Sequence, residues 1–147
     1  MTIQIANQQK LLPIDRKALR AICTAMLRQH HCDADLSLCY VDDRAIRQLN
    51  TRYLGRDDTT DVLAFPLDDD DDPPPAPDAT RMLGEIVVSA ETAAREAAAR
   101  GLPPHAELAL YTIHGLLHLL GYDDQTPHDT ARMRQAEQQA LEAAGLT

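Results

Sequence analysis

The sequence is poor in cysteine, in long apolar runs and in aromatic residues. Its three cysteines, Cys23, Cys32 and Cys39, are odd in number and show no CxxC spacing, which excludes a disulfide framework and a cysteine zinc knuckle. We expect buried or idle thiols. His30 and His31 precede Cys32, but adjacent residues point to different sides, so packing at a helix end is favoured there over a metal site.

Apolar runs are too short for a membrane protein. None approaches the roughly 18–20 residues needed to cross a bilayer, and the start Met1–Ile5 lacks the basic residues of an export signal. We therefore expect a soluble, cytoplasmic protein with no membrane partner.

The formal net charge of −9 argues at first against a nucleic-acid partner, because phosphate binding usually needs a basic surface. The charge is unevenly distributed, however. Residues 1–60 hold nine Lys/Arg and seven Asp/Glu (+2), whereas residues 61–147 hold five and sixteen (−11). Arg44, Arg47, Arg52 and Arg56 recur on one short stretch, which forms either a locally basic face or a merely solvated one.

A length of 147 residues suits one domain spanning 1–147. Hydrophobic periodicity with Pro, Gly and Asp boundaries predicts strands near 2–7, 36–41, 61–66 and 83–89, and helices near 13–29, 44–52, 90–100, 103–120 and 127–144. The acidic, proline-rich stretch 68–81 predicts a mobile surface loop without chemistry. The order predicts an α+β fold, with a small mixed sheet of about four strands packed by about five helices.

The late helix carries the most informative pattern. His114 and His118 are four residues apart, which places both rings on one helix face about 6 Å apart along the axis, within reach of one metal ion. Gly121 and Asp124 stand seven and ten residues after His114, the spacing of the turn glycine and third ligand in HExxHxxGxxH sites. The pattern predicts a metal site on this helix; two core histidines hydrogen-bonded to carbonyls or acids are the alternative.

Zinc accepts two imidazoles and one carboxylate and keeps a fourth position open. We therefore predict one Zn²⁺ ion held by His114, His118 and Asp124, with Asp123 and His128 as competing third ligands. Gly115 stands where a zinc protease carries its catalytic glutamate, so peptide hydrolysis is disfavoured. A glycine inside a helix is more often there for close packing against a strand, which we predict here.

Three stretches, taken together, resemble a known family. Leu49–Pro66 is similar to the pattern LNxxYRxKDxxTDVLSFP, Leu83–Ser89 to LGDIxIS, and His114–Asp124 to HGxLHLxGYDH. These patterns, in this order, are those of the YbeY endoribonucleases, bacterial factors of ribosomal RNA maturation. The resemblance covers most of residues 36–125.

The resemblance implies a small sheet packed by helices, one zinc ion held by three histidines, and metal-dependent cleavage of single-stranded RNA. The ligands would be His114, His118 and residue 124, where this chain has Asp124 instead of histidine. Leu54 stands where the family has an arginine that contacts phosphate. Arg56, two residues on, is our predicted catalytic cation, and Arg52 would help it to hold the RNA backbone.

The leading hypothesis is thus a metal-dependent endoribonuclease in ribosomal RNA maturation (16S rRNA 3′ end processing) and ribosome quality control, with ribosomal RNA and the ribosome or its proteins as partners. The alternative is a non-catalytic ribosome-assembly factor with a structural metal. With four tyrosines, one phenylalanine and no tryptophan, the chain offers few rings for base stacking, so we expect weak sequence preference.

Overall fold

A four-stranded mixed sheet forms the centre of the computed structural model, which describes residues 1–67 and 81–146. The strands are β1 (Ile3–Asn7), β2 (Ala34–Val41), β3 (Val62–Pro66) and β4 (Arg81–Ser89), arranged in the order β1-β2-β4-β3. β1, β2 and β4 are parallel, while β3 pairs antiparallel to β4 and forms one edge. The predicted loop over 68–81 lies outside the described residues except for Arg81, which begins β4.

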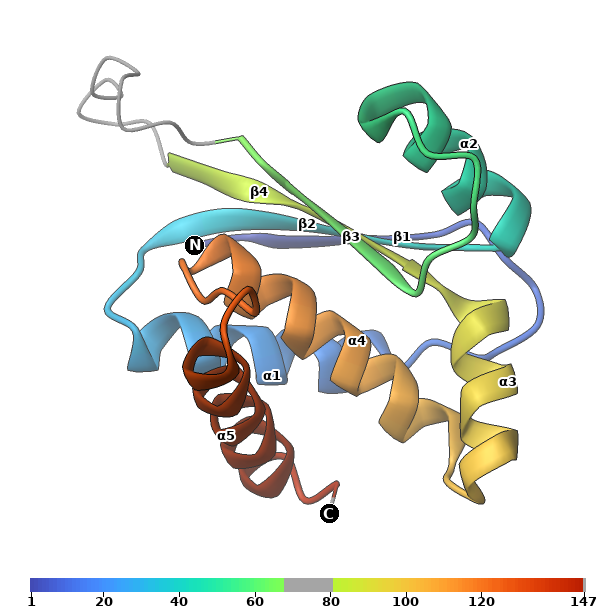
Figure 1. Cartoon of the computed structure of the whole chain (residues 1–147). Helices are drawn as coiled ribbons and strands as arrows, with labels where there is room; N and C mark the ends of the chain where they lie inside the picture. The colour runs from blue at the N-terminus through green and yellow to red at the C-terminus, as the bar shows by residue number, and fades with distance from the viewer. Residues whose placement is uncertain (68–80, 147) are drawn as a thin grey trace.

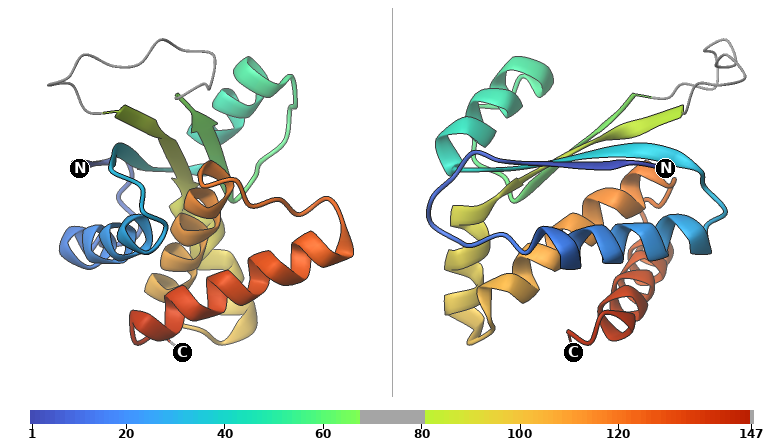
Figure 2. Two further views of the ribbon diagram at one scale, coloured as in Figure 1. Left: turned by 90° about the vertical axis from the view of Figure 1, so that its left-hand side faces the viewer. Right: turned by 180° about the vertical axis from the view of Figure 1, so that it is seen from behind.

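In the described part of the chain, five helices pack around the sheet or on one another: α1 (Arg16–Gln29), α2 (Asp43–Leu54), α3 (Ala90–Arg100), α4 (Pro104–Leu119) and α5 (Pro127–Ala143). α2 lies alone on one face, over a small apolar cluster that includes Ile46 and Val87. α1 and α4 lie on the opposite face over the main core, and α5 packs outside α4 (Figures 1 and 2). The predicted α+β fold is confirmed.

Capping residues set the helix boundaries. The side chain of Asp15 accepts a hydrogen bond from the backbone N–H of Ala18, so α1 begins three residues after Pro13, later than predicted. Asp42 caps α2 in the same way, and Gly55 ends it with a left-handed φ of 68°. The other predicted elements match the observed ones to within about two residues.

α4 is the most buried helix, and Gly115 lets it approach the sheet. A Cβ atom on Gly115 would lie 2.6 Å from Cγ2 of Ile86 in β4 and 3.1 Å from Cγ2 of Val62 in β3. The predicted packing of this glycine against a strand is therefore confirmed. The close approach brings α4 into contact with edge strand β3, and His118 lines a hollow together with the residues of that strand.

The cysteines and the His30 region are structural. Cys23, Cys32 and Cys39 form no disulfide with one another, and burial raises the pKa of Cys23 to about 12. The Nδ1 atom of His30 lies 2.9 Å from the Met26 carbonyl oxygen and its Nε2 atom lies 3.1 Å from the Tyr122 hydroxyl, which ties the end of α1 to the loop after α4. Helix-end packing is thus confirmed. Within residues 1–67 and 81–146, no helix is long and apolar enough to cross a membrane.

Candidate metal centre

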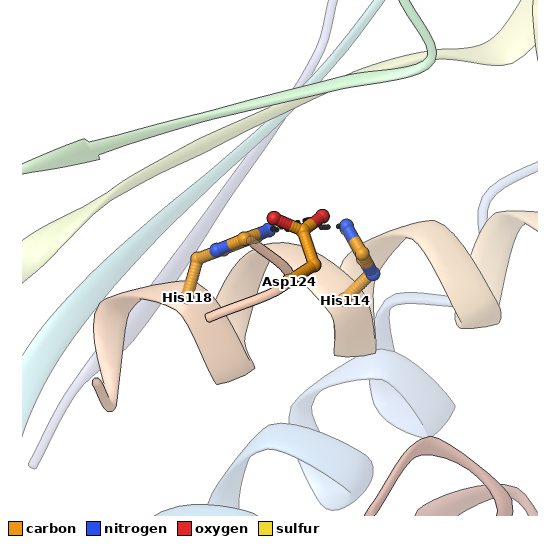
Figure 3. Close-up of side chains that lie close together, drawn as sticks. All are labelled: His114, His118 and Asp124. Atoms are coloured by element: carbon orange, nitrogen blue, oxygen red, sulfur yellow. Dashed lines mark hydrogen bonds and ion pairs between the residues drawn. The ribbon is translucent and has the colours of Figure 1, made fainter. Parts of the chain in front are cut away.

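The two histidines of α4 and an aspartate of the following loop point toward one another (Figure 3). The Nε2 atoms of His114 and His118 are 3.1 Å apart, and Nε2 of His118 lies 3.9 Å from Oδ2 of Asp124. One ligand atom from each of the three residues lies within 4.8 Å of the other two. The cluster could therefore hold a metal ion.

A glycine turn returns the chain to the histidines. Gly121 adopts a φ of 99°, which a side chain would disfavour, and its N–H donates to the His118 carbonyl oxygen at 3.1 Å. The Asp123 carboxylate accepts hydrogen bonds from the backbone N–H groups of Asp124 (2.7 Å) and Gln125 (3.2 Å). Asp123 thus fixes the loop, and among the described residues neither it nor His128 joins the cluster.

Glu137 of α5 is a part of the site that the sequence did not reveal. Its Oε1 atom lies 2.9 Å from Nδ1 of His114, the nitrogen that faces away from the cluster. This hydrogen bond raises the pKa of His114, whereas burial lowers it. The negative charges of Glu137, Asp61 and Asp124 raise the pKa further. With its proton on Nδ1, His114 presents the lone pair of Nε2 to the cluster, as a metal ligand must.

The donor set fits zinc. Tetrahedral coordination at about 2.0–2.1 Å separates ligand atoms by roughly 3.4 Å. The 3.1 Å between the two Nε2 atoms and the 3.9 Å between Nε2 of His118 and Oδ2 of Asp124 lie on either side of that value. The Asp124 side chain is 50% exposed, so it has room to close on an ion. Two imidazoles and one carboxylate leave one coordination position for water or substrate.

Two cavities flank the histidines. A cleft of about 700 Å³ borders His114 and Glu137, and a hollow of about 340 Å³ borders His118 and is lined by Leu54 and all five residues of β3. Leu54, where the resemblance leads us to expect an arginine, thus shares a cavity with His118. The cluster is open to a ligand from either side.

The arginines of α2 and of the segment after it are not among the described residues that line the two cavities. Arg44, Arg47 and Arg52 share one surface hollow on the α2 side, where Arg47 pairs with Asp57 at 2.9 Å. Arg56 is exposed on the segment between α2 and β3. It is not among the described residues that line the two cavities beside the histidines. Its catalytic role stays a prediction.

Comparison with known proteins identifies the family. The protein-family model described as "Endoribonuclease YbeY" matches residues 4–145 of this chain. Proteins named endoribonuclease YbeY from Syntrophus aciditrophicus and Desulforamulus reducens are 41% and 38% identical, and the matches cover 95% and 99% of this chain and 87% and 99% of theirs. The solution structure of TM1509 from Thermotoga maritima superposes with a TM-score of 0.68 at 25% identity, over 97% of this chain and 89% of the other. The resemblance found in the three motifs is thereby confirmed: this chain belongs to the endoribonuclease YbeY family.

Proposed function

We propose that this chain is a metal-dependent endoribonuclease that cleaves single-stranded RNA in ribosomal RNA maturation, including processing of the 16S rRNA 3′ end, and in ribosome quality control in the cytoplasm. The observation that supports it best is the cluster of His114, His118 and Asp124, whose ligand atoms lie within 4.8 Å of one another between two cavities. Family membership supports RNA as the substrate.

His114, His118 and Asp124 would hold one Zn²⁺ ion. Bound there, the ion would act as a Lewis acid that polarises the scissile phosphate. Glu137 holds the His114 ring in the tautomer and orientation that ligation requires. Asp124 brings a negative charge that a histidine would not, so the cluster stabilises the developing charge of the transition state less than an all-histidine site would.

Substrate contacts fall to the cations and polar groups around the cluster. Arg56, together with Arg52, would hold the RNA backbone where the strand leaves the site toward the α2 side. Gly115 offers no base beside His114, which disfavours the protease alternative. The five aromatic residues of the chain leave little base stacking, so cleavage should depend weakly on sequence.

A ribosome-assembly factor that cuts no RNA is the second candidate, and one observation favours it. Leu54 lines the cavity beside His118. None of the described residues that line this cavity is an arginine or a lysine. Phosphoryl transfer needs positive charge near the scissile phosphate. If the remaining cations are too distant, binding would survive without cleavage.

A cleavage assay decides between the two. Purified protein is incubated with single-stranded and duplex ribosomal RNA fragments, with added Zn²⁺ or with a chelator, beside His114→Ala and the matched control His105→Ala. His105 is exposed in the first turn of α4, outside the cluster. We expect cleavage of the single strand by the parent chain and His105→Ala, lost on chelation and in His114→Ala. Ribosome binding without cleavage by the parent chain would support the assembly factor instead.

A further inference from the structure

The larger cleft beside the metal cluster is a binding site without an assigned ligand. It opens between α3, α4 and α5, has a volume of about 700 Å³, and reaches from His114 to Thr59 and Thr60 on the segment before β3. Polar and charged side chains make up most of its lining. This composition suits a polar ligand next to the metal cluster rather than an apolar one.

Three arginines line the cleft, and two of them are paired with acids. Arg95 donates to Asp43 at 2.6 Å, and Arg100 lies 3.7 Å from Glu96 and 3.8 Å from Glu107. These contacts neutralise both guanidinium groups.

The third arginine, Arg134, forms no ion pair with any residue that the structure describes. It is exposed on α5, three residues before Glu137, so the two side chains lie on neighbouring turns of one helix face. Arg134 is therefore a cation about one helical turn from Glu137, which hydrogen-bonds to His114, and it lines the same cleft as that histidine.

The acids of the cleft do not neutralise Arg134. Asp61 accepts hydrogen bonds from its neighbours Val62 N–H (2.8 Å) and Thr60 Oγ1 (3.4 Å). Glu96 pairs with Arg100 at 3.7 Å, and Glu137 with His114 at 2.9 Å. Among the described residues, these acids thus contact groups other than Arg134, so its guanidinium is available to an anion. Asp61 keeps its negative charge, because its partners are an uncharged amide and an uncharged hydroxyl.

We propose that Arg134 binds a backbone phosphate of the RNA strand adjacent to the scissile one, so that the substrate runs through the cleft between α3 and α5. The hydroxyl groups of Thr59 and Thr60 on the opposite wall can donate to the same backbone. The inference rests on the proposed function, because it takes the cluster as the place of cleavage. It adds a substrate cation on α5 to Arg56 and Arg52, which would hold the strand on the α2 side.

The test compares Arg134→Gln with Arg132→Gln and Arg134→Lys. Arg132 lies two residues away on α5 and makes the same charge change, but its guanidinium sits over the Tyr122 ring at 4.7 Å and outside the cleft. Binding is measured with Zn²⁺ and a labelled single-stranded oligodeoxyribonucleotide, which has the same phosphates, over a range of salt concentrations. Cleavage kinetics use single-stranded RNA, and the zinc content of each variant is recorded.

We expect Arg134→Gln to raise Kd and KM roughly three- to tenfold and leave kcat and zinc content unchanged. The slope of log K against log salt should fall in magnitude by about 0.7, the value for one phosphate contact on a single strand. Arg134→Lys should keep that slope, and Arg132→Gln should match the parent chain.

If Arg134→Gln kept the Kd, the KM and the salt slope of the parent chain, the inference would be overturned. An equal loss of affinity in Arg132→Gln would also overturn it, because that result would indicate a general charge effect. Failure of the proposed function is a separate outcome: the parent chain would not cut RNA at all. The binding data would then still decide whether Arg134 holds phosphate.

Discussion

Replacing Glu137 tests whether the hydrogen bond behind His114 prepares the metal site. In Glu137→Ala the Nδ1–H of His114 loses the acceptor at 2.9 Å. Loss of such a partner typically weakens metal binding about 10- to 100-fold, or about 1.4–2.8 kcal/mol. The His114 side chain is 29% exposed, so water can hydrate the freed N–H, and we expect the smaller effect, about tenfold.

A competition titration with a fluorescent zinc chelator near neutral pH measures the change. Glu137→Gln keeps an oxygen acceptor and should lose less affinity than Glu137→Ala. The matched control is Gln138→Ala, because Gln138 is exposed on the same helix and bonds only to Glu142 at 3.2 Å among the contacts described. Circular dichroism verifies that each variant is folded.

Two results would refute this reasoning. A folded Glu137→Ala that binds zinc as tightly as the parent chain would show that the hydrogen bond does not prepare the ligand. An equal loss in Gln138→Ala would show that the effect comes from general changes in α5 and not from the contact with His114.

Three further variants test the third ligand, the helix packing and an ion-pair network. Asp124→Ala should lower the zinc content after dialysis, whereas Asp124→His should retain it; full zinc content in Asp124→Ala would exclude this ligand. Gly115→Ala should lower the free energy of unfolding by about 1–2 kcal/mol in denaturant titrations, because a Cβ 2.6 Å from Ile86 forces the core to shift; an unchanged value would contradict the packing. Burial raises the pKa of Asp43, but hydrogen bonds from two hydroxyl groups and Arg95 outweigh it and lower the pKa overall. The parent chain should therefore lose stability as the pH falls from about 4 through that lowered pKa, and Asp43→Asn should lose less over this range.

Secondary structure was predictable because local signals mark its ends. Asp42 before α2, Ser89 before α3 and Gly101 after it fix boundaries through contacts within a few residues. The start of α1 was misplaced because two signals competed: Pro13 can open a helix, but Asp15 caps it. That choice depends on local energies which a pattern of residue types does not rank.

The site was predictable only in part, for a related reason. His114, His118 and Asp124 lie on one helix and its adjoining loop, so their spacing predicts that they meet. Glu137 comes from α5, and its contact with His114 depends on how two helices pack. One signal was present: Glu137 is an acid four residues after the apolar Met133, so it lies on the same helix face as a residue suited to the core.

Charge is distributed unequally on the two sides of the cluster. Leu54 lines the cavity beside His118, whose described lining holds no arginine or lysine, and Asp124 carries a negative charge at the cluster. Both features weaken attraction for phosphate on the His118 side. Arg134 adds a free cation on the opposite side, within the cleft beside His114. With the proposed contact at Arg134, a phosphate backbone would be held best when it approaches along α5, and the cleft between α3 and α5 would be the side from which this chain takes its substrate.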